Sequence, residues 1–209
     1  MRCFLKHTIS IAILALPLTS FAQVPNAIDQ LKPYLQVKPV DGDENKVRGF
    51  FSPSCGYSKM YFQFFKNLSM TLPTGTKFEF TPLVNKRDGI SYALSFEAVK
   101  KYYPSYVNNY VEASLVGVQD KGLSTLNWSA IERIGKAARI PASIPKLVHD
   151  HFDDLRADVQ STMALQHNLT IANTPAVSVA GTYIVTPEFT NGDAALFSQL
   201  VNGIISMSR

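Results

Sequence analysis

Cys55 and Ser58 are the first residues to consider for chemistry, because a cysteine can act as a nucleophile. They enclose Gly56 and Tyr57, so the segment is a C-x-x-S motif. The thiolate form of cysteine attacks disulfides, and thiol-disulfide exchange is therefore the chemistry that Cys55 could perform. The spacing by itself carries little weight, since a serine three residues after a cysteine is common by chance. Its value depends on the elements around it.

Two elements of secondary structure are predicted to meet at Cys55. Residues 47–52 form a short β-type run that stops at Pro53, which predicts a core strand. Beyond this point, apolar residues recur at helical spacing, namely Tyr57, Tyr61, Phe64, Phe65 and Leu68. The free N–H groups and the dipole at the start of a helix stabilise an anion, so this position favours a thiolate. Ser58, one turn into the helix, can donate its hydroxyl to the sulfur or simply occupy a first-turn position.

The second candidate element is the dipeptide Thr174–Pro175, which directly precedes a strand predicted for residues 176–179. A proline at the mouth of a strand occupies one of the few places that proline takes in sheets, and cis X-Pro bonds occur in tight turns. We predict a cis peptide bond between these two residues. An ordinary trans loop proline is the alternative.

The rest of the pattern predicts the fold that must hold these two elements. A strand is expected at 77–81, and the order strand, helix, strand predicts a parallel pair, with a solvated turn at 85–89. Helical spacing dominates residues 91–169. The chain then returns to a β-hairpin that turns at 180–181, and a final amphipathic helix is expected to close over the sheet.

Within the helical stretch, Ser129 followed by Glu132 predicts a capping box at the start of a helix. The apolar stripe from Val148 to Met163 predicts one long helix. This stripe is interleaved with a dense group of possible metal ligands, namely His149, Asp150, His151, Asp153 and Asp154. On a helix, only His149 with Asp153 and Asp150 with Asp154 would share a face, because the members of each pair are four positions apart. A solvated surface is therefore the favoured interpretation, and no metal site is expected.

The N-terminal residues predict export. Basic residues precede a mostly apolar run from 9 to 18, and small residues lead up to Ala22. This is the pattern of a cleavable signal peptide over residues 1–22, and its apolar run is too short to span about 30 Å of hydrocarbon. A periplasmic protein without a stable membrane anchor is therefore expected.

The predicted cleavage leaves Cys55 as the single cysteine, because Cys3 would be removed with the signal. A lone cysteine cannot form an internal disulfide, so Cys55 is a candidate reactive thiol; a small buried apolar residue is the alternative. The net charge of +4 at pH 7 gives no support for a nucleic-acid partner. No phosphate-binding loop or Gly-x-Ser-x-Gly motif is present in the sequence, and no cofactor is expected.

Together these segments resemble the DsbA family of thiol-disulfide oxidoreductases. Residues 34–40 and 47–55 resemble the segment that leads into that family's active site, and residues 174–177 with 181–185 resemble its cis-proline loop and hairpin. The likeness covers most of the predicted mature chain and is specific in these segments. It implies an α/β protein with a thioredoxin-like fold and an inserted helical domain.

The resemblance also implies domain limits. Residues 1–22 are the signal peptide, residues 23–90 with 170–209 form the thioredoxin-like core, and residues 91–169 form the inserted helical domain. It further assigns catalytic positions to Cys55 and Ser58, and substrate-binding positions to Gly56, Tyr57, Thr174 and Pro175.

Two residues depart from the family's pattern. Ser58 stands where the family has its resolving cysteine, and Tyr57 stands where a histidine is common. A serine hydroxyl cannot replace the second sulfur, so the expected function is a monothiol isomerase or reductase of exported proteins that contain cysteines. Another substrate thiol, glutathione or a periplasmic reductant would release the enzyme. The alternatives are a redox-inactive peptide-binding module or chaperone, and a glutathione-dependent enzyme of the same fold.

Overall fold

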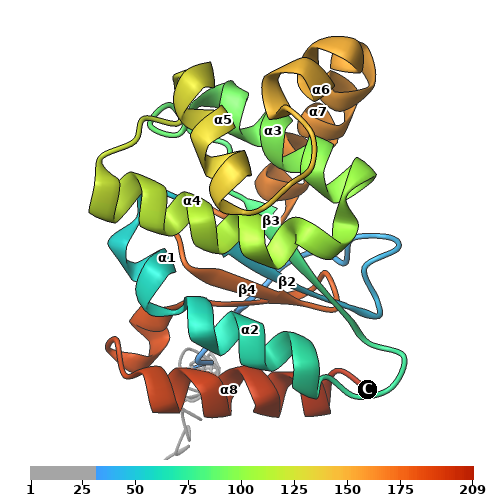
Figure 1. The fold of residues 1–209 in the computed structure, drawn as a ribbon. Helices are drawn as coiled ribbons and strands as arrows, with labels where there is room; N and C mark the ends of the chain where they lie inside the picture. The colour runs from blue at the N-terminus through green and yellow to red at the C-terminus, as the bar shows by residue number, and fades with distance from the viewer. Residues whose placement is uncertain (1–31) are drawn as a thin grey trace, which may run out of the picture. The chain divides into compact units, whose positions relative to one another are not determined.

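A five-stranded sheet lies at the centre of the part of the chain that the structure, a computed structural model, describes, residues 32–209 (Figure 1). The strands are β1 (Leu35–Gln36), β2 (Lys46–Phe51), β3 (Lys77–Pro82), β4 (Ala176–Val179) and β5 (Tyr183–Val185). Their order is β1-β5-β4-β2-β3, in which β2 and β3 are parallel and the other neighbours are antiparallel. The predicted parallel pair and the predicted hairpin are confirmed. The predicted signal peptide and Cys3 lie outside the described residues.

Helices cover the sheet on two sides. The helices of the described residues are α1 (Gly56–Met60), α2 (Phe62–Thr71), α3 (Gly89–Tyr102), α4 (Val107–Lys121), α5 (Trp128–Ala137), α6 (Ile144–Asp150), α7 (Phe152–Asn168) and α8 (Ala194–Met207), with short 3-10 helices η2 (Pro104–Tyr106) and η3 (Pro187–Thr190). Figure 1 shows α2 and α8 on one side of the sheet and the group from α3 to α7 on the other. The latter group is one continuous stretch of chain between β3 and β4.

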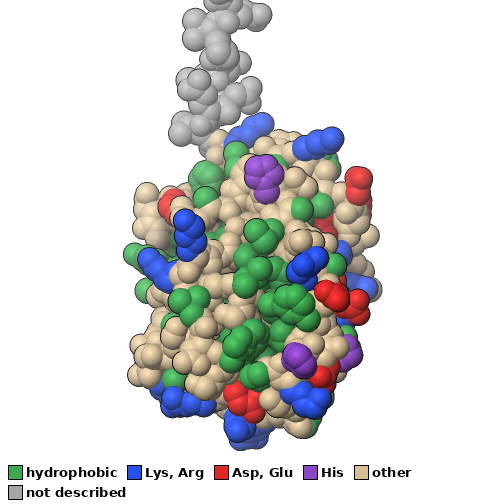
Figure 2. Space-filling view, turned by 90° about the horizontal axis from the view of Figure 1, so that it is seen from above, with side chains coloured by type: hydrophobic (Ala, Val, Ile, Leu, Met, Phe, Trp, Pro, Cys, Tyr) green, Lys and Arg blue, Asp and Glu red, His purple; other side chains and the backbone are tan. Residues whose placement is uncertain are grey.

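The outer face of the helical group is seen in Figure 2, where apolar side chains gather near the centre and charged side chains lie mostly toward the edge. Large apolar side chains that remain exposed on this stretch of chain are Ile90, Leu126, Trp128, Phe152 and Met163. Phe152 and Met163 were expected to lie on the buried stripe of one long helix. That expectation is wrong: the stretch divides at His151 into α6 and α7, and the buried face of α7 runs through Leu155, Val159 and Thr162, which leaves Phe152 and Met163 exposed.

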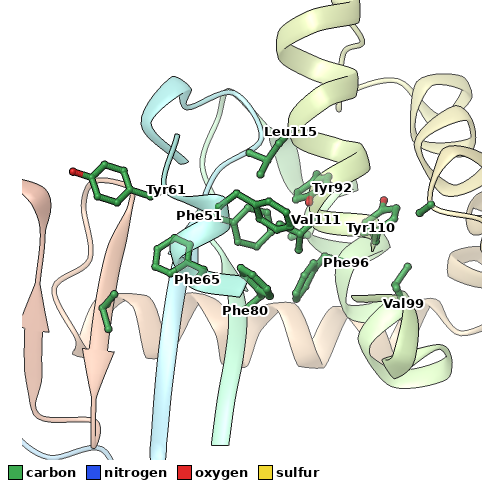
Figure 3. Packing of buried hydrophobic residues seen from close by; sticks show 14 of the residues in the cluster. Phe51, Tyr61, Phe65, Phe80, Tyr92, Phe96, Val99, Tyr110, Val111 and Leu115 are labelled. Carbon is green, nitrogen blue, oxygen red and sulfur yellow. The ribbon is translucent and has the colours of Figure 1, made fainter. Parts of the chain in front are cut away.

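Buried aromatic rings join the sheet to the helices (Figure 3). The ring of Phe51, at the end of β2, lies 5.8 Å from that of Phe80 on β3 and 5.7 Å from that of Phe96 on α3. Phe65 on α2 contacts the Phe80 ring edge-on from the other direction at 6.1 Å. Edge-to-face pairs of this kind add to the free energy gained by burying the rings. The end of β2, which leads to Cys55, is thereby held from both layers.

The helix that follows Cys55 is shorter than its pattern predicts. It divides at Tyr61 into α1 and α2, and Tyr57, which was expected on the buried face, is 61% exposed. The capping box is also wrong. Asn127 caps α5 by accepting a hydrogen bond from Ser129 N. The carboxylate of Glu132 instead accepts hydrogen bonds from Ser143 Oγ and Ile144 N at the start of α6, so it is not available for a local cap.

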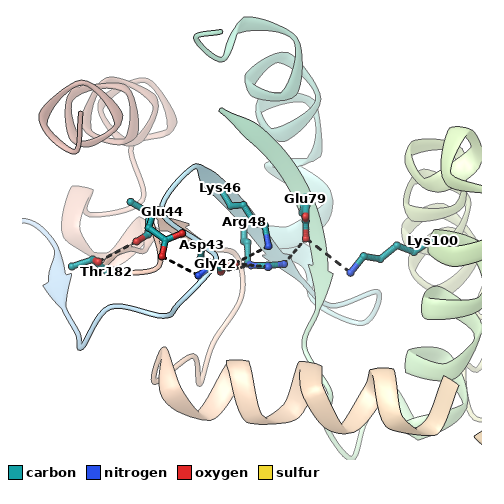
Figure 4. Close-up of polar contacts among 9 residues, drawn as sticks. Gly42, Asp43, Glu44, Lys46, Arg48, Glu79, Lys100 and Thr182 are labelled. Carbon is teal, nitrogen blue, oxygen red and sulfur yellow. Dashed lines mark hydrogen bonds and ion pairs between the residues drawn. The ribbon is translucent and has the colours of Figure 1, made fainter. Parts of the chain in front are cut away.

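A buried ion network ties the start of β2 to β3 (Figure 4). Arg48 is 7% exposed, and its guanidinium donates to both carboxylate oxygens of Asp43 at 2.6 and 2.7 Å and to Glu79 at 2.6 Å. Burial alone would raise the pKa of Asp43, but the hydrogen bonds from Arg48 and Lys46 outweigh it, so this pKa lies below its ordinary value of 3.8. Lys100 extends the network to α3, with its ammonium 4.0 Å from Glu79.

Arg48→Ala should lower the free energy of unfolding by about 3–5 kcal/mol, because it leaves the Asp43 carboxylate buried without its partner. Urea unfolding at pH 6 measures this loss. Lys101→Ala, which removes an exposed ion pair with Asp158, is the matched control and should cost no more than about 1 kcal/mol.

The same pair predicts a pH dependence. Because the pKa of Asp43 is depressed in the folded state, its contribution to stability is present above about pH 4 and is lost as the pH falls below that value. The difference in unfolding free energy between the wild type and Arg48→Ala should therefore shrink between pH 6 and pH 3. A difference that is constant over this range would contradict the ionic role of the pair.

Candidate active site

Cys55 lies at the junction of β2 and α1. It precedes α1 as the N-cap residue, with an extended backbone (φ −93°, ψ 115°), and its N–H donates to Ser52 O at 3.0 Å. The residues from 52 to 55, which we call the Cys55 turn, therefore close a tight loop between strand and helix. The side chain of Cys55 is half-buried. A thiol in this place is open to solvent on one side and near the N–H groups that begin α1 on the other.

The dipeptide Thr174–Pro175 lies directly beside Cys55. Its peptide bond is cis, as the sequence analysis expected. The thiol of Cys55 donates to Thr174 O across 3.1 Å, although the two residues are 119 positions apart in the sequence. Antiparallel pairing of β4 with β2 produces this contact, because it places Ala176 opposite Phe50 and so brings the loop before β4 next to the turn after β2.

Ser58 is fully buried, and its hydroxyl points into the protein. Its Oγ accepts a hydrogen bond from Ser52 N at 3.1 Å. Within residues 32–209, no hydrogen bond joins this hydroxyl to Cys55 Sγ. Ser58 therefore closes the Cys55 turn from inside, which is a structural contact that the sequence analysis did not anticipate.

An open groove of about 560 Å³ runs past the sulfur. It is lined by Ser52, Ser54, Cys55, Tyr57, Leu83, Asn85, Lys86, Arg87, Ala172, Asn173, Thr174 and Glu188. Of the site residues predicted from the sequence, Cys55, Tyr57 and Thr174 line this groove. Gly56 is exposed beside it, whereas Pro175 and Ser58 are buried behind it.

Asp88 is a residue of the site that the sequence analysis missed. It was expected in a solvated turn but is 1% exposed, and its carboxylate accepts hydrogen bonds from Ser52 Oγ, from Ser54 N at 3.2 Å and from Asn85 Nδ2 at 3.0 Å. The loops that follow two adjacent parallel strands emerge at the same edge of a sheet. The predicted β2 and β3 pair was therefore a usable signal that Asp88 would reach the Cys55 turn.

Gln119 is the second residue that was missed. Its side-chain amide, on α4, donates to Pro53 O at 2.9 Å and to Cys55 O at 3.0 Å. An ion pair between Lys59 on α1 and Asp120, the residue that follows Gln119 on α4, joins the same two helices. No local pattern in the sequence could have indicated these contacts, because they depend on how the helical group packs against α1.

The described residues contain no group of three or more His, Cys, Asp or Glu side chains that could hold a metal ion. Of the acidic residues considered as ligands, Asp150 instead pairs with Lys146 at 2.5 Å. Across residues 32–209, no helix is long and apolar enough to cross a membrane.

Comparison with known proteins identifies the fold. No protein-family model and no curated protein sequence matches the chain. Solved structures do match: DsbA from Xylella fastidiosa has a TM-score of 0.71 at 14% identity, covering 84% of this chain and 95% of its own. DsbA from Pseudomonas aeruginosa has a TM-score of 0.71 at 14% identity, covering 85% and 93%. A Proteus mirabilis DsbA variant with a non-covalently bound peptide has a TM-score of 0.68 at 15% identity, covering 84% and 95%.

These matches define the class of the protein. The chain has the thioredoxin-like fold of the DsbA oxidoreductases, an α/β fold in which a group of helices is inserted between β3 and β4. The fold class predicted from the sequence is confirmed. At these identities the likeness concerns the fold, so the chemistry rests on the residues around Cys55.

Ser58→Ala should lower the free energy of unfolding by about 1–3 kcal/mol, because the buried N–H of Ser52 would lose its acceptor. Thermal or urea unfolding measures this loss. Ser161→Ala removes a hydroxyl that bonds within α7 on the surface and should have little effect. Equal stability of the two variants would show that the contact between Ser52 and Ser58 does not stabilise the turn.

Proposed function

We propose that the protein is a periplasmic thiol-disulfide exchange protein that acts on exported proteins through Cys55 alone. The observation that carries this proposal is the place of the Cys55 thiol, at the start of α1, 3.1 Å from Thr174 O and open to the groove. Because Ser58 supplies no second sulfur, the proposed activity is that of a monothiol isomerase or reductase.

The groove supports a peptide as the substrate. Thr174 lines it beside the sulfur, and Gly56 and Tyr57 are exposed next to it, so an extended chain could contact all three while presenting a disulfide to Cys55. The Proteus mirabilis structure, in which a DsbA variant holds a peptide non-covalently, is consistent with this use of the fold. Thr174 and Pro175 are proposed to bind the substrate backbone.

The proposed reaction begins when the Cys55 thiolate attacks one sulfur of a substrate disulfide. A bond forms between Cys55 Sγ and that sulfur, the substrate disulfide breaks, and the other substrate sulfur leaves as a thiolate. Because Ser58 has no sulfur, an external thiolate must then attack the mixed disulfide and restore the Cys55 thiolate. A thiol of the same substrate gives isomerisation, whereas glutathione or a periplasmic reductant gives reduction.

Two alternatives rest on particular residues. A redox-inactive peptide-binding module or chaperone is favoured by Ser58, which is fully buried and engaged with the backbone. A glutathione-dependent enzyme is favoured by Lys86 and Arg87, which are exposed on the wall of the groove that holds Cys55 and could receive the carboxylates of that tripeptide.

The proposal also includes export and the domain limits. Cleavage after Ala22 would release the mature chain. Residues 23–90 and 170–209 would form the thioredoxin-like core, and residues 91–169 would form the helical insertion.

Isomerisation of a scrambled-disulfide substrate in a glutathione buffer tests the function. Wild type should speed recovery of the correctly paired substrate, and Cys55→Ala should reduce the rate to that of buffer, because no nucleophile remains in the groove. Ser161→Ala is the matched surface control and should retain the wild-type rate. Equal rates for wild type and Cys55→Ala would reject exchange chemistry. Suppression of substrate aggregation that persists in Cys55→Ala would then favour the binding module.

Ser58→Cys should shorten the lifetime of the mixed disulfide by about 100-fold or more when no glutathione is present, because a neighbouring thiol reacts at a high effective concentration. Acid quenching followed by mass spectrometry measures the fraction of protein bound to a cysteine-containing peptide. Ser161→Cys, with its second thiol on the distant surface of α7, should behave as wild type. If the two cysteine variants release the peptide equally slowly, a thiol at position 58 cannot resolve the mixed disulfide, and the prediction is wrong.

A further inference from the structure

The Cys55 turn forms hydrogen bonds with two separate segments that follow it in the sequence. From the loop between β3 and α3, Asp88 accepts the Ser54 N–H at 3.2 Å and the Ser52 hydroxyl. From α4, Gln119 donates to Pro53 O at 2.9 Å and to Cys55 O at 3.0 Å. Each residue of the turn is therefore bonded to Asp88 or to Gln119.

Asp88 is an unusual residue to find behind a thiol. Its carboxylate is 1% exposed, and no lysine, arginine or histidine forms an ion pair with it within residues 32–209. A buried carboxylate without a cation is retained only when hydrogen-bond donors satisfy it. Here Ser52, Ser54 and Asn85 supply these donors, and two of the three belong to the Cys55 turn. The burial of this charge is thus tied to the conformation of the turn.

Gln119 binds the turn through its carbonyls rather than its N–H groups. One amide nitrogen donates to two carbonyl oxygens that are two residues apart, and this is possible only if both carbonyls point toward α4. The N–H groups and the carbonyls of the turn are therefore fixed from different directions, which leaves its backbone little freedom to rotate.

We propose that Asp88 and Gln119 are positioning residues that together hold the Cys55 turn, so that Cys55 Sγ stays against Thr174 O and in line with a peptide disulfide in the groove. This inference rests on the proposed exchange function and adds to it the residues that set the geometry of attack. Reaction rates depend steeply on such alignment, since a displacement of about 1 Å can cost up to about 100-fold.

A pair of disulfides that release the same chromophore separates positioning from general stability. One is a cysteine peptide joined to 5-thio-2-nitrobenzoate, and the other is 2-mercaptoethanol joined to the same group. In both, Cys55 Sγ bonds to the aliphatic sulfur and the aryl thiolate leaves. Only the peptide must also dock in the groove beside Thr174 while it reacts, so only its rate should depend on where the turn holds Cys55.

Asp88→Asn and Gln119→Met should each slow the reaction of the peptide disulfide about tenfold and change the rate of the small disulfide by no more than about twofold. The matched control is Glu97→Gln, which alters a different buried carboxylate, on α3, that is 5% exposed, bonded to Thr162 and 3.5 Å from the ammonium of Lys100. It should destabilise the protein and leave the ratio of the two rates unchanged. If both disulfides slow equally in the Asp88 and Gln119 variants, or if Glu97→Gln shifts the ratio to the same extent, the proposal is overturned.

The double variant Asn85→Asp/Asp88→Asn keeps the test decisive if Asp88→Asn alone fails to fold. This double variant exchanges the carboxylate and the amide of the hydrogen bond between residues 85 and 88, so the side chain of residue 88 can still accept from Ser54 N. The double variant should recover at least half of the lost selectivity for the peptide disulfide. No recovery in a folded double variant would count against the role of Asp88.

Deuterium exchange at the Ser54 amide distinguishes failure of this inference from failure of the proposed function. If the wild type reacts no faster with the peptide disulfide than with the small one, the proposed peptide-binding function of the groove is rejected. The positioning role of Asp88 is then tested by the exchange rate of this amide alone. Asp88→Asn should speed its exchange about tenfold or more, and Glu97→Gln should leave it unchanged. Unchanged exchange in Asp88→Asn would overturn the proposal.

Discussion

Backbone pairing between β2 and β4 brings together two loops that are 119 residues apart in the sequence. Opposite Phe50 lies Ala176, so the turn that ends β2 and the dipeptide that precedes β4 lie side by side. The contact between Cys55 and Thr174 depends on this register, because a shift by one residue would turn the side chains of a strand to the other face of the sheet. The groove beside the sulfur exists only while these two strands remain paired.

The helical group contributes to the site as well as to the core. Its residues are inserted between β3 and β4, and the rings of α3 pack against Phe51 at the end of β2. At the same end, Asp88 and Gln119 reach the Cys55 turn from the beginning of α3 and from α4. Packing of the insertion and the position of the thiol are therefore coupled, since a change in one moves the partners of the other.

Two buried charges in this protein are satisfied in different ways. Asp43 is neutralised by Arg48 at the start of β2, far along the strand from the thiol, and this pair stabilises the sheet. Asp88 is satisfied by neutral donors, Ser52 and Ser54 after β2 and Asn85 in its own loop, and no ion pair to it is present within residues 32–209. The first arrangement serves stability, whereas the second ties a buried charge to the conformation of the turn that carries Cys55. Ser58 likewise serves the turn, through the backbone of Ser52.

Local patterns in the sequence determined the secondary structure around Cys55. A β-type run that ends at a proline, helical spacing after Gly56, and the run from Thr174 to Val185 each follow from steric and hydrophobic preferences within a few residues. They sufficed for the strand, for helical structure after it, for the parallel pair and for the hairpin, whereas the fold class came from the resemblance to DsbA proteins. The resemblance to DsbA proteins added the pairing of Cys55 with Thr174 and Pro175.

Only the tertiary structure decided which polar groups are buried and what satisfies them. From the sequence, Asp88 is expected in a solvated turn and Glu132 in a local cap. In the structure, Asp88 instead accepts a hydrogen bond from Ser54, and Glu132 accepts one from Ile144. The division of the stripe at His151 has the same origin, because packing of two helices against α3 outweighs the continuity of one. Such choices depend on long-range contacts that no window of the sequence contains, and among them the contacts of Asp88 and Gln119 reach the turn that carries Cys55.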